Sequence, residues 1–135
     1  MPEPLDITPV DQLASLPRHP SSATAARVLL RGFLGDVKGG ERYVDDGELI
    51  VTELVTHAVL RERKPEHLLL DVLFEYSAPT GLRITVQDVG LRGRRAGEDR
   101  AAGLGVVHQL ASTWGREISE GELSTLLVWA QLAPW

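Results

Sequence analysis

The chain has 135 residues, of which 43% are hydrophobic and 24% charged, with a formal net charge of −5 and no cysteine. Such a composition is typical of one globular domain, and the acidic balance argues against direct binding to nucleic-acid phosphates. The lack of cysteine excludes disulfides and thiolate metal sites. No apolar run approaches the roughly 18 residues that span a bilayer, and residues 1–9 do not resemble a signal peptide. We therefore expect a cytoplasmic protein that does not bind membranes.

The N-terminal segment is rich in proline and has only short apolar pieces. Proline lacks a backbone N–H and interrupts regular structure. We expect an N-terminal arm over residues 1–20, with at most a short turn or strand around Leu13–Leu16. A single domain is then expected over residues 21–135.

The first predicted helix starts after the arm and ends before Gly39. Ser21 or Ser22 is its expected N-cap, because a serine hydroxyl can accept a hydrogen bond from a free N–H of the first turn. The residues expected to face the core are Ala25, Val28, Leu29 and Phe33.

The central segment, Asp45–Leu60, has the clearest helical period. Its apolar residues recur three and four positions apart, which predicts an amphipathic helix with one face on the core. Asp45 or Asp46 is the expected N-cap, and acidic residues favour the positive end of the helix dipole. The expected buried residues are Ile50, Val51, Leu54, Val55 and Ala58.

The second half of the chain indicates two hairpins separated by a loop and a helix. The first hairpin joins 67–76 to the alternating strand 82–90, and the second spans 114–132 with a turn at Glu120-Gly121. A polar loop over 89–102 leads into a helix over 103–115, with Val106, Val107, Leu110 and Ala111 expected inward. Helices combined with antiparallel hairpins predict an α+β fold, a two-layer sandwich with helices on one face of a largely antiparallel sheet.

Three short motifs occur in order along these elements: ELVTHA on the central helix, DVG at the end of a strand, and GLG at the start of a helix. Each alone has an ordinary structural explanation, as a boundary pair, a turn or a cap. Together, in this order and spacing, they resemble the GHKL superfamily of ATP-binding domains, which have the Bergerat fold. Within this superfamily of histidine-kinase-like ATPases, the resemblance is greatest to the small anti-sigma factor serine kinase-like branch, and it covers 21–132.

The resemblance implies a nucleotide pocket between the helices and the sheet. Glu53 matches the family's general base. Asp88 matches the aspartate that accepts a hydrogen bond from the adenine amino group, and Gly90 lets the backbone approach the ring. The loop 91–102 matches the ATP lid. Backbone N–H groups at a helix start are a suitable anion site, and this phosphate cradle maps to Gly103, Leu104 and Gly105.

The pocket also departs from the family pattern. His57 stands where the family has an asparagine that ligates Mg²⁺, and imidazole is a poor ligand for this ion. Arg92 replaces a glycine; it either closes over the phosphates or is an ordinary solvated lid residue. Ala101 replaces another glycine, and Leu126 and Leu127 replace a lysine-threonine pair. We therefore expect Mg²⁺ not to bind, ATP to bind weakly at most, and phosphoryl transfer, which needs the metal ion, to be lost.

These observations favour a regulatory protein-binding module of anti-sigma-factor type, acting in transcription regulation. Its implied partner is a sigma factor or an anti-sigma antagonist, and the resemblance also allows a homodimer. Two alternatives stay open. One is an active ATP-dependent serine kinase that phosphorylates the antagonist, and the other is nucleotide binding without turnover.

Overall fold

The computed structural model describes residues 8–61, 69–91, 104–119 and 123–135. Within these ranges the chain forms an α+β fold, with a five-stranded antiparallel sheet and three α-helices packed against it. The elements in chain order are β1 (Val10–Pro17), α1 (Ser22–Gly35), the short 3-10 helix η1 (Gly40–Tyr43), α2 (Val44–Arg61), β2 (Leu69–Ser77), β3 (Gly81–Leu91), α3 (Gly105–Leu110), β4 (Thr113–Ser119) and β5 (Leu123–Leu132).

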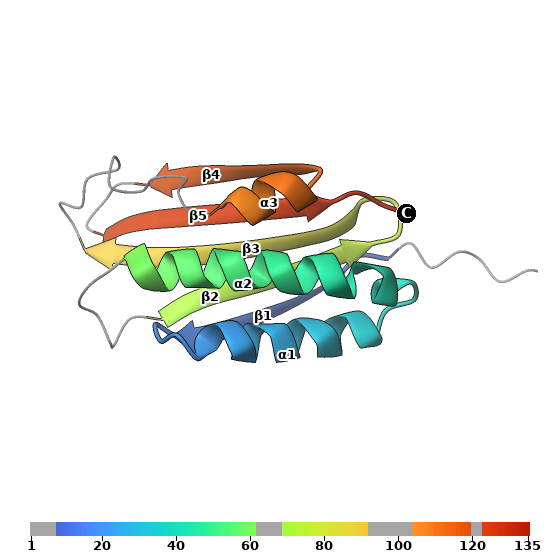
Figure 1. The fold of residues 1–135 in the computed structure, drawn as a ribbon, viewed down its shortest axis with the longest axis horizontal. Coiled ribbons are helices and arrows are strands. Elements are labelled where there is room, and N and C mark those ends of the chain that lie inside the picture. The colour runs from blue at the N-terminus through green and yellow to red at the C-terminus, as the bar shows by residue number, and fades with distance from the viewer. Residues whose placement is uncertain (1–7, 62–68, 92–103, 120–122) are drawn as a thin grey trace, which may run out of the picture.

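The strands are ordered β1-β2-β3-β5-β4, and every neighbouring pair is antiparallel. Figure 1 shows the three helices on one face of the sheet, with α2 between α1 and α3. The predicted hairpins are confirmed as the β2–β3 and β4–β5 pairs. The predicted α+β class with an antiparallel sheet is also confirmed.

The N-terminal segment contributes more to the sheet than its sequence indicates. The strand expected around Leu13–Leu16 spans Val10–Pro17 and pairs along its whole length with β2. It forms one edge of the sheet, where Pro9 and Pro17 flank or end it without breaking central pairing. Residues 10–17 are therefore part of the folded layer.

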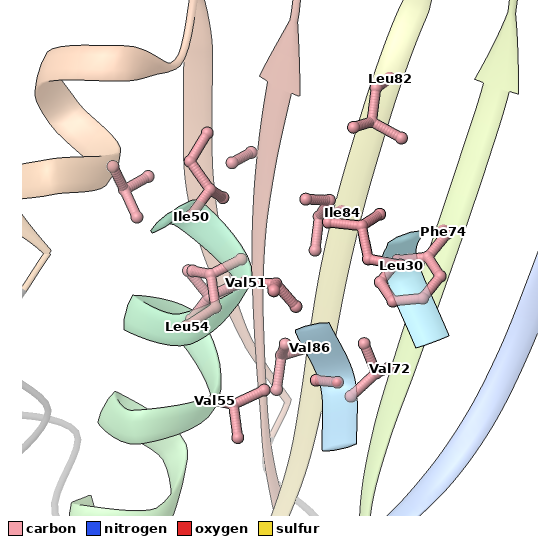
Figure 2. Close-up of a cluster of buried hydrophobic side chains, with 14 of the residues drawn as sticks. Leu30, Ile50, Val51, Leu54, Val55, Val72, Phe74, Leu82, Ile84 and Val86 are labelled. Carbon is pink, nitrogen blue, oxygen red and sulfur yellow. The ribbon is translucent and has the colours of Figure 1, made fainter. Parts of the chain in front are cut away.

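Helix α2 covers the centre of the sheet, and all five of its predicted core residues are buried to 3% exposure or less. All five belong to one core cluster with the inward side chains of β2 and β3, and Figure 2 shows four of them, Ile50, Val51, Leu54 and Val55. Burying each of the isoleucine, leucine and valine side chains contributes about 1.5–3 kcal/mol. The N-cap prediction for this helix is wrong, because α2 begins at Val44, directly after η1, and Asp45 and Asp46 lie inside its first turn. Both carboxylates still lie near the positive end of the helix dipole.

The predicted inward stripe of α1 is largely wrong. Phe33 is buried, but Ala25 is exposed, Val28 is 64% exposed and Leu29 is only half-buried. The buried apolar positions are Ala23, Ala26, Leu30, Phe33 and Leu34. Apolar residues occur nearly all round this helix, so its periodicity alone could not choose which side faces the sheet.

The start of α1 also differs in its hydrogen bonding. Ser21 is the N-cap residue, but its side chain makes no capping bond to the helix. Its hydroxyl instead lies 2.7 Å from Nδ1 of His19, and the Ser22 hydroxyl donates to the carbonyl of Pro17. These bonds shape the turn between β1 and α1.

Helix α3 is shorter than predicted. It has six residues, and the chain becomes extended at Ala111 before β4 begins at Thr113. Of its expected inward residues only Val107 is fully buried, while Leu110 and Ala111 are half-buried against the core. β-branched and aromatic residues such as Thr113 and Trp114 favour a strand. Among the described helices, none is long and apolar enough to cross a membrane.

The two sides of α1 give a direct stability test. We expect Leu30→Ala to lower the free energy of unfolding by about 2–5 kcal/mol, because it leaves a cavity under α2. Val28→Ala removes an exposed side chain of the same helix, and its effect should stay within about 0.5 kcal/mol. Urea unfolding of both variants measures this difference. Equal losses would contradict the orientation of α1.

A second test concerns Tyr43 in η1, whose phenol donates to the carbonyl of Ala133 at 3.2 Å. Burial raises the pKa of this phenol above its ordinary value of 10.0. Above that pH the unfolded chain releases its proton first, so the free energy of unfolding falls until the folded-state pKa is reached. We expect Tyr43→Phe to flatten this fall between about pH 9 and pH 11, measured by urea unfolding. An unchanged slope would be the contrary result.

Candidate functional site

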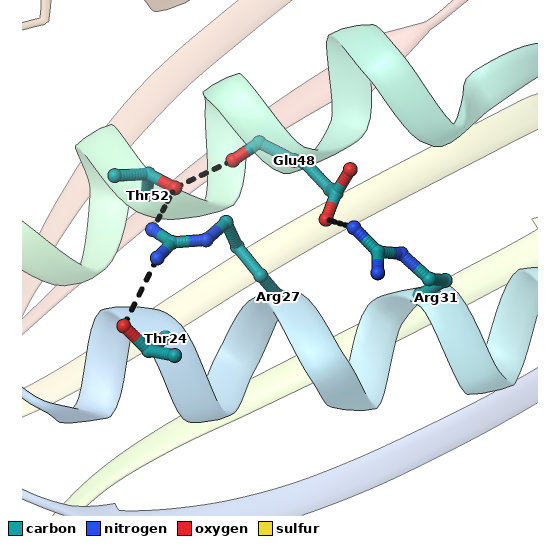
Figure 3. Close-up of polar contacts among 5 residues, drawn as sticks. All are labelled: Thr24, Arg27, Arg31, Glu48 and Thr52. Atoms are coloured by element: carbon teal, nitrogen blue, oxygen red, sulfur yellow. Dashed lines mark hydrogen bonds and ion pairs between the residues drawn. The ribbon is translucent and has the colours of Figure 1, made fainter.

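The two motif residues on α2, Glu53 and His57, lie on one side of the helix. Glu48 and Thr52 accept hydrogen bonds from Arg31 and Arg27 of α1, as Figure 3 shows. By helical period, Glu53 and His57 lie on the opposite flank of α2, and both are half-buried. Helix α3 packs against α2, and it lies away from α1 (Figure 1).

Asp88 lies near the end of β3, on the face that the helices cover. Its cross-strand neighbours are Leu70 of β2 and Leu126 of β5, both buried, and Asp88 itself is only 1% exposed. A carboxylate in this position needs a charged or hydrogen-bonding partner, because burial of an unpaired charge costs several kcal/mol. Two residues further along β3, Gly90 pairs with Ser124 of β5.

The partner of Asp88 is Arg18, which follows directly after β1. Arg18 is 8% exposed, and its guanidinium forms an ion pair with Oδ1 of Asp88 in which both side chains are 2% exposed. A second guanidinium nitrogen, Nη1, donates to the carbonyl oxygen of Ala58 at 3.0 Å. Arg18 therefore connects three elements at one place: the β1–α1 turn, the C-terminal part of α2 and the end of β3.

This arrangement does not fit an adenine base at Asp88. The resemblance assigns the carboxylate to the adenine amino group, but here a guanidinium of the same chain occupies it, in a place closed to solvent. A planar guanidinium saturates a carboxylate more strongly than a neutral amino group does. Any nucleotide base would have to displace a buried ion pair, and breaking such a pair costs about 3–5 kcal/mol.

The expected phosphate cradle is only partly described. Leu104 is buried at 1% exposure and precedes α3, and Gly105 is the first, exposed residue of that helix. A Cβ added at Gly105 would meet no atom within 4 Å, so packing does not require a glycine there. Gly103, Arg92 and most of the expected lid, 92–102, lie outside the described residues.

The expected metal position gives no cluster of ligands. In the described ranges, no group of three or more His, Cys, Asp or Glu side chains is placed to hold a metal ion. His57 contributes one imidazole nitrogen on the flank of α2, whereas Mg²⁺ prefers oxygen ligands. The expectation that Mg²⁺ does not bind stays a prediction.

Arg18 is the residue of this site that sequence reasoning missed. It stands in the segment PRHPSS, between two prolines and without hydrophobic period. Nothing local distinguishes it from a solvated arginine of an arm. Only the pairing of β1 with β2 brings the end of β1 beside the end of β3, and this pairing joins parts of the chain that are far apart in sequence.

Comparison with known proteins adds no relative to this picture. No protein-family model matches the chain, and no curated protein matches it significantly. The assignment of a family therefore depends on the motifs and their placement alone.

A double-mutant cycle tests the ion pair. We expect Arg18→Met and Asp88→Leu each to lower the free energy of unfolding by about 3–5 kcal/mol, because each leaves a buried charge without its partner. The double variant should recover much of this loss, because it buries two apolar side chains instead. Urea unfolding measures all three.

The matched control for this cycle is the surface pair between Arg31 and Glu48, in which the Arg31 side chain is 67% exposed. Arg31→Met should cost no more than about 1 kcal/mol, because solvent screens an exposed pair. If the losses at Arg18 and Asp88 simply add in the double variant, the two side chains are not coupled.

Proposed function

We propose that this protein is a regulatory protein-binding module of anti-sigma-factor type with a GHKL ATPase-like, Bergerat-type fold and a degenerate nucleotide site. In this proposal its partner is a sigma factor or an anti-sigma antagonist, and Mg-ATP catalysis has been lost. The observation that carries the loss of nucleotide chemistry is the buried ion pair between Arg18 and Asp88.

The arrangement of elements supports the fold assignment. Two helices precede an antiparallel hairpin, and a short helix and a second hairpin follow, with all helices on one face of the sheet (Figure 1). Asp88 lies at the end of the inner strand β3, and Gly105 begins the next helix. This is the order in which the GHKL resemblance requires the motifs.

Two independent features support the loss of catalysis. Arg18 neutralises the carboxylate that would select adenine. His57 takes the place of a magnesium-ligating amide, and phosphoryl transfer depends on that ion for charge neutralisation. If neither adenine nor Mg²⁺ is bound, no phosphate is held in place for a general base at Glu53 to act on. The fold then serves through its surfaces.

Thermal unfolding with nucleotide tests this part of the proposal. We expect ATP at millimolar concentration, with or without Mg²⁺, to leave the melting temperature unchanged. A ligand present at about 100 times its dissociation constant would instead add about 2.7 kcal/mol of stability. The variant His57→Asn with Arg92→Gly restores two family residues but leaves Arg18 in place. We expect it, too, to show no shift.

Affinity capture tests the partner. We expect a sigma factor or its antagonist to be retained from the native cell, equally with and without ATP and Mg²⁺. Transfer of the γ-phosphate of ATP to a serine of the captured antagonist would refute the loss of catalysis and establish the serine-kinase alternative. Stabilisation by ATP that needs no Mg²⁺ would establish a nucleotide sensor.

A further inference from the structure

The sheet has a second face, which none of the described helices covers (Figure 1). Side chains on this open face alternate with the buried ones along each strand. The positions on this face include Leu13 of β1, Leu73 of β2, Thr85 of β3, Trp129 of β5 and Gly115 of β4, which follow one another across the sheet as direct cross-strand partners.

The β3–β5–β4 half of this face is covered by its own side chains. The guanidinium of Arg83 lies 4.3 Å from the ring centre of Trp129, and its Nε donates to Oε1 of Gln131 at 3.0 Å. The indole lies so close over Gly115 that an added Cβ would come within 2.9 Å of it. In this cation–π stack Trp129 is half-buried.

On the β1–β2 half, large apolar side chains of the described residues are exposed. Leu13 is 64% exposed and Leu69 is 54% exposed, and Leu73 lies directly opposite Leu13 in the pairing register. At the end of the row, Pro17 pairs with Leu69. Two apolar pairs thus lie on the open side of this edge, Leu13 with Leu73 and Pro17 with Leu69, and the polar pair of Ser15 and Asp71 separates them. Exposed leucines are unusual on the solvent side of an edge strand.

The charges that β1 and β2 carry beside these leucines are all negative, while Arg83 of β3, the cross-strand partner of Glu75, places its guanidinium over Trp129. Asp11 of β1 and Glu75 of β2 are direct cross-strand partners, and neither strand contains a lysine or arginine. Like charges directly opposite destabilise a strand pair by several tenths of a kcal/mol. The third carboxylate, Asp71, accepts a hydrogen bond from the Ser15 hydroxyl at 2.7 Å. The pair formed by Asp11 and Glu75 has no ion-pair partner among the described residues.

We propose that the open face of β1 and β2 binds an amphipathic helix of a protein partner, with leucine-type side chains on Leu13, Leu69 and Leu73 and basic side chains at Asp11 and Glu75. A helix is the natural cover for an apolar sheet face. A lysine or arginine from the partner offsets the repulsion between the two carboxylates. The apolar contacts supply affinity, and the charges select the partner and speed its approach. This surface deepens the proposed function, since it assumes a protein partner.

Binding of designed peptides tests the surface. The probe is an amphipathic peptide of about 18 residues with leucine on one face and lysine on the other, and its matched control replaces every lysine by glutamate. We expect the wild-type protein to bind the leucine-lysine peptide and not the leucine-glutamate peptide, measured by fluorescence anisotropy. Glu75→Lys and Leu13→Ser should each weaken this binding about tenfold or more.

The control variants make the same chemical changes elsewhere. Asp36→Lys changes an exposed carboxylate at the end of α1, and Leu60→Ser changes a side chain of α2 that is 76% exposed. Both should bind the peptide as the wild type does. Equal weakening by Asp36→Lys and Glu75→Lys would show general charge attraction only and would overturn the proposal, as would failure of the wild type to bind.

Two further outcomes separate this surface from the proposed function. If sedimentation shows a wild-type dimer that Leu13→Ser dissociates, a second copy of the chain covers the face and the proposal is wrong. If a captured sigma factor or antagonist binds Leu13→Ser and Glu75→Lys as tightly as the wild type, the surface is refuted while the protein-binding function stands. If Leu13→Ser and Glu75→Lys weaken capture and the control variants do not, the result supports both the surface and the proposed function.

Discussion

The ion pair between Arg18 and Asp88 is the constraint on which the arrangement of this protein depends. It joins the end of the first strand to the end of the central strand β3, and through the Ala58 carbonyl it joins both to α2. A buried charge pair is seldom a gain in stability over apolar packing, but it is expensive to break and it tolerates only one geometry. It therefore fixes the register of an edge strand whose own sequence specifies it weakly. The same pair uses the one carboxylate through which a GHKL-like pocket would recognise adenine.

Much of the fold could be predicted from the sequence where one period dominates. Helix α2 has a single apolar stripe, and β3 alternates strictly between Leu82, Ile84 and Val86 on one side and polar residues on the other, so both were predicted with the correct buried face. Helix α1 is apolar on most sides, and its orientation depends on which side meets α2 and the sheet. Strand β1 ends in a proline and its apolar residues do not alternate, so only its pairing with β2 makes it a strand. The orientation of α1 and the formation of β1 are therefore both decided by tertiary contacts and not by the local sequence.

The candidate site divides in the same way. The motif residues Glu53, Asp88 and Gly105 lie on the elements where the sequence placed them: α2, the end of β3 and the start of the following helix. Their surroundings were not predictable, because the partner of Asp88 comes from a segment 70 positions earlier that has no recognisable pattern. A motif specifies which side chain is present, and long-range topology decides whether that side chain is accessible. Here the motif implies that Asp88 binds adenine, but Asp88 is buried in an ion pair with Arg18.

The position of Arg18 immediately after β1 links two surfaces that lie on opposite faces of the sheet. β1 carries Leu13 and Asp11 on the open face, and the residue after its last position reaches to the buried side. Within the sheet, β1 pairs with β2 alone. If β1 detaches, its hydrogen bonds to β2 break and the guanidinium of Arg18 leaves Asp88 in the same event. Edge strands open more readily than central ones. A partner that keeps β1 paired with β2 would therefore also keep Asp88 buried in its ion pair with Arg18. Binding at the open face and burial of Asp88 would then be coupled.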